Sequence, residues 1–202
     1  MSRQWLVAAA AFTLLLTGCG EAPKRAEKKK APPAPLTGMS AFFKMFGQAR
    51  TWAPDVQGMK CEPIAITGQP SGDGKWPAWR CQFVSESKKR SKTFSFSIVE
   101  AEGVHEGVFG GPEESYTGPV GQTLPFIVQA LKKDSDAAIR VAKEKSKAYM
   151  AKNPDMPITV VLERTKRHPN LAWRVIWGTS LQTSNYSIYV DASTGEYLET
   201  MH

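Results

Sequence analysis

The sequence predicts an α+β fold in which two α-β-β-β repeats form an antiparallel sheet with the helices packed on one face. Ala78-Trp79-Arg80 recurs as Ala172-Trp173-Arg174. In both halves a segment of helical period precedes segments that alternate apolar and polar residues. A sheet with one apolar face must bury that face, and a helix from the same repeat is the natural cover.

The first repeat is predicted over residues 39–110. Ser40 is a suitable helix cap, and an apolar stripe at helical spacing follows it. The stripe consists of Phe42, Met45, Phe46 and Ala49. Strands are expected near residues 60–67, 76–85 and 92–101.

The second repeat is predicted over residues 134–202, after an inter-repeat loop of residues 111–133. Within that loop, residues 124–129 are either a short strand or the entry to the next helix. Asp134 or Ser135 caps a helix that ends before Asn153-Pro154, because a residue preceding proline avoids the α region. Strands are expected at residues 158–164, 171–179 and 186–190.

The last predicted hairpin carries a family resemblance. Its second strand runs into Val190-Asp191-Ala192-Ser193-Thr194-Gly195-Glu196, which is similar to the V-D-x-x-T-G-E ending of PepSY domains in bacterial secreted and membrane proteins. The resemblance covers residues 134–196 and implies a module that restrains peptidases. The first repeat lacks the T-G-E ending, and the resemblance assigns no inhibitory residue.

The first 18 residues predict a signal peptide, with Arg3 ahead of an apolar run too short to span a bilayer. Leu16-Thr17-Gly18-Cys19 resembles the lipobox of bacterial lipoproteins, which implies cleavage before Cys19 and its acylation. We favour this interpretation over an ordinary signal peptide with an incidental cysteine. More than one acyl chain gives a stable membrane anchor. Gly20 in place of Asp favours the outer membrane, facing the periplasm, over the inner membrane.

Residues 19–38 predict an extended tether rich in Lys, Pro and Ala. A solvated linker is favoured over binding of Lys28–Lys30 to anionic headgroups. Arg3 and the tether, with five basic and two acidic residues, account for four of the seven net positive charges of the chain. The folded part therefore has little excess charge, and together with export this excludes nucleic acid as a partner.

The remaining cysteines, Cys61 and Cys81, predict a disulfide in an oxidising compartment. The intervening turn, residues 68–74, is centred on Ser71, which places the two cysteines opposite each other in a hairpin. A disulfide is favoured over two free thiols. It is also favoured over zinc, since no further Cys or His completes a set of four ligands. We predict no metal and no cofactor.

Neither the three histidines nor the clustered acidic residues indicate catalysis. His105, His168 and His202 are expected in exposed loops or at the terminus, and no nucleophile motif, HExxH or P-loop accompanies them. We therefore predict a protein that is not an enzyme.

A partner surface is predicted on the sheet face away from the helices. The residues expected there are more apolar than a solvated face requires: Ile64, Ile66, Val161, Ile176 and Tyr189. Contact between the repeats, or cover by the loop of residues 102–124, is the equally weighted alternative. The sequence thus favours a lipid-anchored module that binds or inhibits another envelope protein. A structural part of an outer-membrane assembly and a small-ligand carrier remain as alternatives.

Overall fold

The computed structural model of the chain describes residues 33–119, 121–182 and 184–202, which belong to one compact unit, Pro33–His202. The predicted signal peptide, Cys19 and most of the tether lie outside these residues. Within the described part, no helix combines the length and apolar character that crossing a membrane requires.

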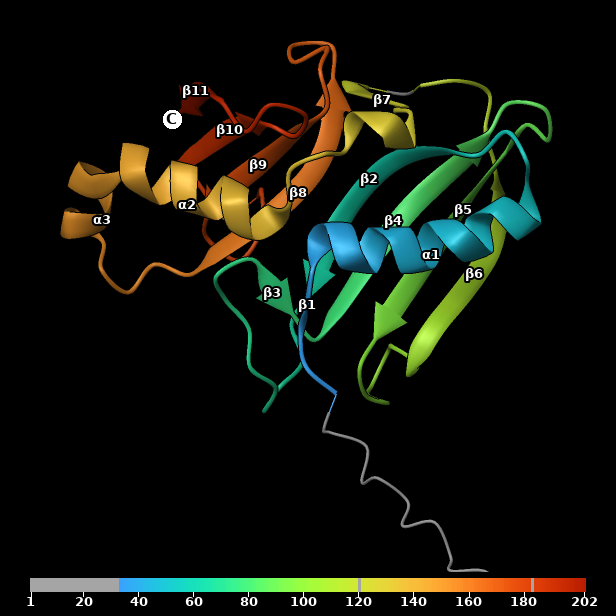
Figure 1. Ribbon diagram of the computed structural model, residues 1–202, viewed down its shortest axis with the longest axis horizontal. Coiled ribbons are helices and arrows are strands. Elements are labelled where there is room, and N and C mark those ends of the chain that lie inside the picture. Colours follow the sequence, from blue (N-terminus) through green and yellow to red (C-terminus); the bar gives the residue numbers. More distant parts are fainter. Residues whose placement is uncertain (1–32, 120, 183) are drawn as a thin grey trace, which may run out of the picture. The chain divides into compact units, whose positions relative to one another are not determined.

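One large antiparallel sheet organises the fold (Figure 1). Its strand order is β11-β10-β9-β8-β2-β4-β5-β6, and β7 pairs with β8 off this path. The strands of the first half are β2 (Gln57–Ile64), β4 (Ala78–Ser85), β5 (Arg90–Ser97) and β6 (Gly107–Ser115). Those of the second half are β7 (Thr123–Leu124), β8 (Ile158–Thr165), β9 (Ala172–Trp177), β10 (Ser187–Asp191) and β11 (Tyr197–Met201).

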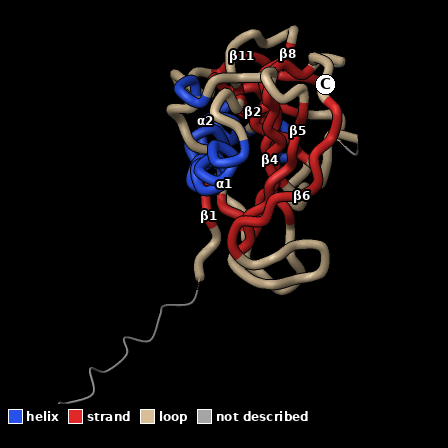
Figure 2. Tube along the Cα trace, turned by 90° about the vertical axis from the view of Figure 1, so that its right-hand side faces the viewer, coloured by secondary structure: helices blue, strands red, loops and turns tan. Residues whose placement is uncertain are grey.

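The helices lie on one side of this sheet (Figure 2). They are α1 (Gly38–Trp52), α2 (Ser135–Lys145) and α3 (Lys147–Lys152), with a 3₁₀ turn at Val128–Ala130. Two short strands, β1 (Leu36–Thr37) and β3 (Lys75–Trp76), pair with each other. The predicted α+β class, with helices packed on an antiparallel sheet, is confirmed.

Each half of the unit is a helix followed by a meander of four strands, one more than predicted. The halves join where β2 pairs with β8, through Lys60 opposite Glu163 and Cys61 opposite Leu162. The additional strands, β6 and β11, are the two edges of the sheet. β6 occupies residues assigned in part to the inter-repeat loop, because an edge strand tolerates the Gly110-Gly111-Pro112 sequence that typically marks a loop.

The main core fills the space between the helices and the sheet. Its largest fully buried side chains include Trp79, Trp173, Trp177, Phe42 and Phe83. The alternation read from the sequence is correct here, since Trp173, Val175 and Trp177 all belong to this core. Burial of such aromatic side chains is the largest favourable contribution that a fold of this size has.

The cap of α1 differs from the prediction. Thr37, not Ser40, precedes the helix, and its side chain caps no backbone N–H. The first N–H groups of α1 instead donate to the other half: Gly38 N to Ser135 Oγ at 2.8 Å and Met39 N to Asp134 Oδ1 at 2.9 Å. Asp134 is also the N-cap of α2 and accepts from Ser135 N. One carboxylate therefore serves the positive ends of both helix dipoles.

The structure also differs from the prediction in the second helix, and it resolves the two alternatives for residues 124–129. The second helix is interrupted at Ser146, whose hydroxyl donates 2.7 Å to the carbonyl of Ala142, so α2 and α3 are separate segments. The segment of residues 124–129, for which two alternatives were open, begins in β7 and ends in the 3₁₀ turn.

Candidate functional site

The sheet face away from the helices is the predicted partner surface. Among the described residues no helix covers it (Figure 2). Side chains from alternate residues of neighbouring strands lie on it in register. The two halves of the sheet close this face to different extents.

In the second half, Tyr189 and the side chains around it cover part of this face. Its hydroxyl donates 2.9 Å to Glu163 Oε1, and both side chains are buried. The His168 ring packs on the Tyr189 ring with centroids 4.0 Å apart, and the Arg174 guanidinium lies 5.2 Å from the Tyr189 ring centroid. Burial, followed by the nearby Glu163 carboxylate, raises the pKa of Tyr189.

His168 was expected to be an exposed loop residue, but its side chain is only 12% exposed. Its Nε2 lies 3.2 Å from Glu199 Oε2, without the geometry of a hydrogen bond, and Arg167 pairs with the same carboxylate. Burial lowers the pKa of His168, and the Glu199 charge opposes this only in part. The β8–β9 turn therefore folds back over the sheet through this histidine.

The five predicted partner-surface residues do not form an exposed apolar face, and that prediction is wrong. Val161, Ile176 and Tyr189 are 4%, 0% and 3% exposed. Residues 179–182, in the loop after β9, line the same cavity of about 200 Å³ as Val161 and Ile176. Ile64 is the half-buried last residue of β2, and Ile66 lies half-buried beyond the strand. Residues 179–182 and the Tyr189 cluster cover this face in the second half. The loop of residues 102–124, which was one of the alternatives, contributes Tyr116, and this ring is buried with Met59 and Val84 in the first half.

In the first half the part of this face around Lys60 and Arg80 is an open polar groove. It comprises two adjoining cavities of about 230 and 270 Å³ that share Lys60 and Gln82. The cavity of about 200 Å³ beside Val161 and Ile176 meets this groove at Lys60, Glu62 and Arg80. Side chains of β2, β4 and β5 line the groove: Lys60, Glu62, Arg80, Gln82 and Thr93. Residues 179–182 line one end and residues 114–118 contribute to the other. We call this surface the polar groove.

A triad of charged side chains marks the middle of the polar groove. Lys60 Nζ lies 2.6 Å from Glu62 Oε2, and Arg80 Nε donates 2.8 Å to Glu62 Oε1. Burial by itself raises the pKa of Glu62, but hydrogen bonds and charge from Lys60 and then Arg80 outweigh it, so that this pKa is lowered. Lys60 and Glu62 flank Cys61, and Arg80 and Gln82 flank Cys81, so that polar residues alternate with a buried cysteine on both strands. This pattern was a sequence signal for the site, and the search for apolar residues missed it.

Arg80 and Arg174 occupy equivalent places in the repeated Ala-Trp-Arg triplet, yet their surroundings differ. Arg174 lies opposite Tyr189, and its Nε donates 3.0 Å to Ser187 Oγ. Arg80 lies opposite the much smaller Ser95, and its side chain is 58% exposed. The position that an aromatic ring fills in the second half is therefore open in the first.

The disulfide lies beneath the polar groove, on the core side of the same strands. Cys61 and Cys81 are register partners on β2 and β4, are bonded to each other, and are both fully buried. The bond covalently joins the two strands that carry the triad.

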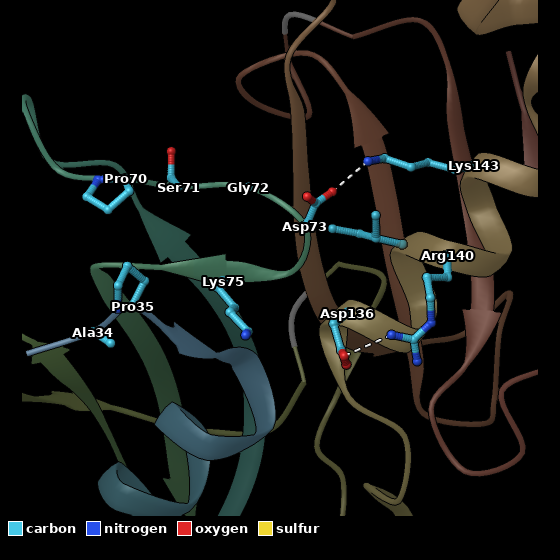
Figure 3. A pocket seen from close by; sticks show the side chains of 11 residues that line it. Ala34, Pro35, Pro70, Ser71, Gly72, Asp73, Lys75, Asp136, Arg140 and Lys143 are labelled. Carbon is cyan, nitrogen blue, oxygen red and sulfur yellow. Dashed lines mark hydrogen bonds and ion pairs between the residues drawn. The ribbon is translucent and has the colours of Figure 1, made fainter.

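A second cavity, of about 700 Å³, lies between the residue 70–75 turn and α2 (Figure 3). Two ion pairs line it, Lys143 with Asp73 at 2.7 Å and Arg140 with Asp136 at 3.0 Å. Pro35, near the start of the described chain, contributes to its wall. Most of its charges are thus neutralised within the chain.

The V-D-x-x-T-G-E segment has a structural role. The Asp191 carboxylate accepts from the N–H groups of Ser193 and Thr194, and Gly195 has a φ of 84°. The carbonyl of Ala192 accepts from the N–H groups of Lys132 and Lys133, just before α2. The turn therefore fixes the entry to the second helix.

Comparison with known proteins gives little guidance. No family model matches the chain, and no curated protein sequence matches it either. Among solved structures, the chain is similar to a candidate lipoprotein from Clostridium difficile 630, with 8% identity and a TM-score of 0.48. The match covers 85% of this chain and 95% of that one. A likeness at this level says nothing about function.

Proposed function

We propose that this protein is a lipid-anchored, non-catalytic component of the bacterial cell envelope that binds another envelope protein through the polar groove. The observation that carries the proposal is the difference between the two halves of the sheet. Tyr189, His168 and the β9 loop fill the face in the second half, whereas the first half leaves the equivalent surface unfilled around Arg80. The charged and polar side chains of this groove offer hydrogen bonds and charge to a partner polypeptide.

The anchor is supported by the sequence alone, through the lipobox-like Leu16-Thr17-Gly18-Cys19 and the Lys/Pro/Ala tether that follows it. The outer membrane, facing the periplasm, is the proposed location. Cys19→Ser should abolish incorporation of labelled palmitate and leave the precursor unprocessed. Normal labelling of this variant would refute the anchor without affecting the proposal about the groove.

Site-specific cross-linking in intact cells tests the groove. A photoreactive p-benzoyl-phenylalanine at Gln82 lies in the polar groove, whereas the same residue at Gln48 lies exposed on α1, on the helix side of the sheet. We expect a discrete cross-linked envelope protein from position 82 and none from position 48. Identical adducts from both positions, or none from position 82, would be inconsistent with binding in the groove.

The identity of the cross-linked protein distinguishes an inhibitory role from a structural role. A peptidase agrees with the PepSY resemblance, whose sequence motif lies at residues 190–196. An outer-membrane assembly protein indicates a structural role. The small-ligand carrier remains a second candidate because the cavity beside α2, at about 700 Å³, has the volume of many ligand sites. Recovery of a small molecule with the purified protein, lost in a Ser71→Trp variant at the exposed wall of this cavity, would favour it.

A further inference from the structure

The guanidinium of Arg80 has unused hydrogen-bonding capacity in the polar groove. Only its Nε bonds to Glu62, and among the described residues its terminal nitrogens make no hydrogen bond or ion pair. A guanidinium presents its donors as a planar fork that matches a carboxylate in two parallel hydrogen bonds. The exposed edge of Arg80 is therefore suited to a carboxylate supplied from outside the chain.

The charge balance around Arg80 also favours an incoming negative charge. Lys60 and Arg80 share the single carboxylate of Glu62. The other carboxylate near Lys60 in register, that of Glu163, is buried and accepts the hydroxyl of Tyr189. Within the triad, two cations therefore face one carboxylate, and Arg80 is the more exposed of the two cations.

The second half shows how the chain itself fills the equivalent position. There Tyr189 lies beside Arg174, and its polar end reaches Glu163. Ser95 is the corresponding neighbour of Arg80, and its side chain is too small to cover the guanidinium in the same way. The remaining lining, from Gln82 and Thr93, offers hydrogen bonds without a large apolar area, which suits an extended polar segment better than an apolar side chain.

We infer that the polar groove binds an extended acidic segment of a partner polypeptide, with a carboxylate of that segment on Arg80. This inference rests on the proposed function and specifies its partner. Glu62 competes with the incoming carboxylate for both cations. Its removal is therefore expected to strengthen binding, whereas loss of Arg80 weakens it.

Binding of defined peptide probes to the full chain in detergent tests the inference. The probes are fluorescein-labelled peptides of alternating Ser and Glu and a matched series of alternating Ser and Gln, measured by fluorescence polarisation. We expect the Glu probe to bind at least about tenfold more tightly than the Gln probe, a difference of about 1.4 kcal/mol. Arg80→Gln should abolish this difference, and Glu62→Gln should increase it.

Arg140→Gln is the matched control, because Arg140 is also an exposed arginine paired with a carboxylate, on α2. This variant should retain the preference for the Glu probe. Inorganic phosphate should displace the probe no better than sodium chloride at equal ionic strength, since a single anion lacks the further contacts that an extended segment makes along the groove.

Three results would overturn the inference: equal affinities for the two probes, no binding of either, or equal losses in Arg80→Gln and Arg140→Gln. Competition by phosphate alone would indicate a phosphate site instead of an acidic segment. If cross-linking at position 82 succeeds while the probes do not discriminate, the groove remains a binding site and only its acidic specificity is refuted. If cross-linking also fails, the proposed function itself is refuted.

Discussion

Trp79 and Trp173 meet edge to face at the centre of the core, with ring centroids 6.3 Å apart and ring planes at 71°. The indole N–H of Trp79 donates 3.0 Å to the carbonyl of Leu36, and that of Trp173 donates 2.8 Å to the carbonyl of Lys133. Each carbonyl belongs to the residue two positions before the helix of the same half. The repeated Ala-Trp-Arg triplet thus holds both helices to the sheet in the same way.

Either tryptophan should be costly to remove. Both rings are fully buried, so Trp79→Ala and Trp173→Ala should each lower the free energy of unfolding by about 3–5 kcal/mol. The double variant should cost less than the sum of the two, because the contact between the rings is lost only once. Urea denaturation provides the measurement, with the exposed Phe43→Ala as a control expected within about 0.5 kcal/mol of the wild type.

The shared cap predicts an unequal effect of two substitutions near the helix starts. Asp134→Ala removes the acceptor of Met39 N and Ser135 N and should destabilise the protein by about 1–2 kcal/mol. Ser40→Ala should have almost no effect, although the sequence suggests it as the cap, because Ser40 is exposed and accepts only from Thr37. Equal losses in thermal or urea unfolding would show that the cap was assigned incorrectly.

The disulfide between Cys61 and Cys81 closes a loop of 20 residues. Its removal in a Cys61→Ala, Cys81→Ala variant should cost roughly 3 kcal/mol in the chain-entropy model. Since both cysteines are fully buried, alkylation of the native, non-reduced protein followed by mass spectrometry should find neither modified. Two alkylated cysteines after unfolding without a reductant would show that the bond is absent.

A substitution at Ile176 tests whether this part of the sheet face is buried. Ile176→Asp places a carboxylate at a fully buried position and should destabilise the fold by at least about 3 kcal/mol. Thr93→Asp, on the same face but in the polar groove, should change the free energy of unfolding by no more than about 1 kcal/mol. A stable Ile176→Asp protein would restore the exposed apolar surface that the sequence suggested.

His168 should make stability depend on pH just below neutrality. Because its pKa is lowered in the folded state, the unfolded chain binds a proton first as the pH falls. The contribution is fully present above the ordinary histidine pKa of about 6.5 and is lost as the pH falls from there through the lower pKa of the folded state. Urea unfolding between about pH 5.5 and 7.5, above the carboxylate range, should show this decline in the wild type. The decline should be smaller in His168→Gln, and equal slopes would exclude His168 as its source.

The sequence by itself determined the features that depend on the alternation of side chains along a strand and on the position of a hairpin turn. Alternation along residues 172–177 identified the face of β9 that belongs to the main core, and a turn centred on Ser71 placed Cys61 opposite Cys81. These features were predictable because the side-chain period of a strand is fixed and a hairpin partner follows from the position of its turn. The edge strands β6 and β11 were missed because half of their pairing surface faces solvent, where composition imposes few requirements.

Only the tertiary structure decided which part of the uncovered face is open. Tyr189 and Ile176 look like exposed apolar residues in the sequence, and they are buried because His168, Glu163 and residues 179–182 lie against them or line the same cavity. The capping of α1 by Asp134 likewise joins residues 95 positions apart. Contacts between segments so distant in the chain leave no periodic signal, because they depend on how the two halves pack and not on the spacing within either one.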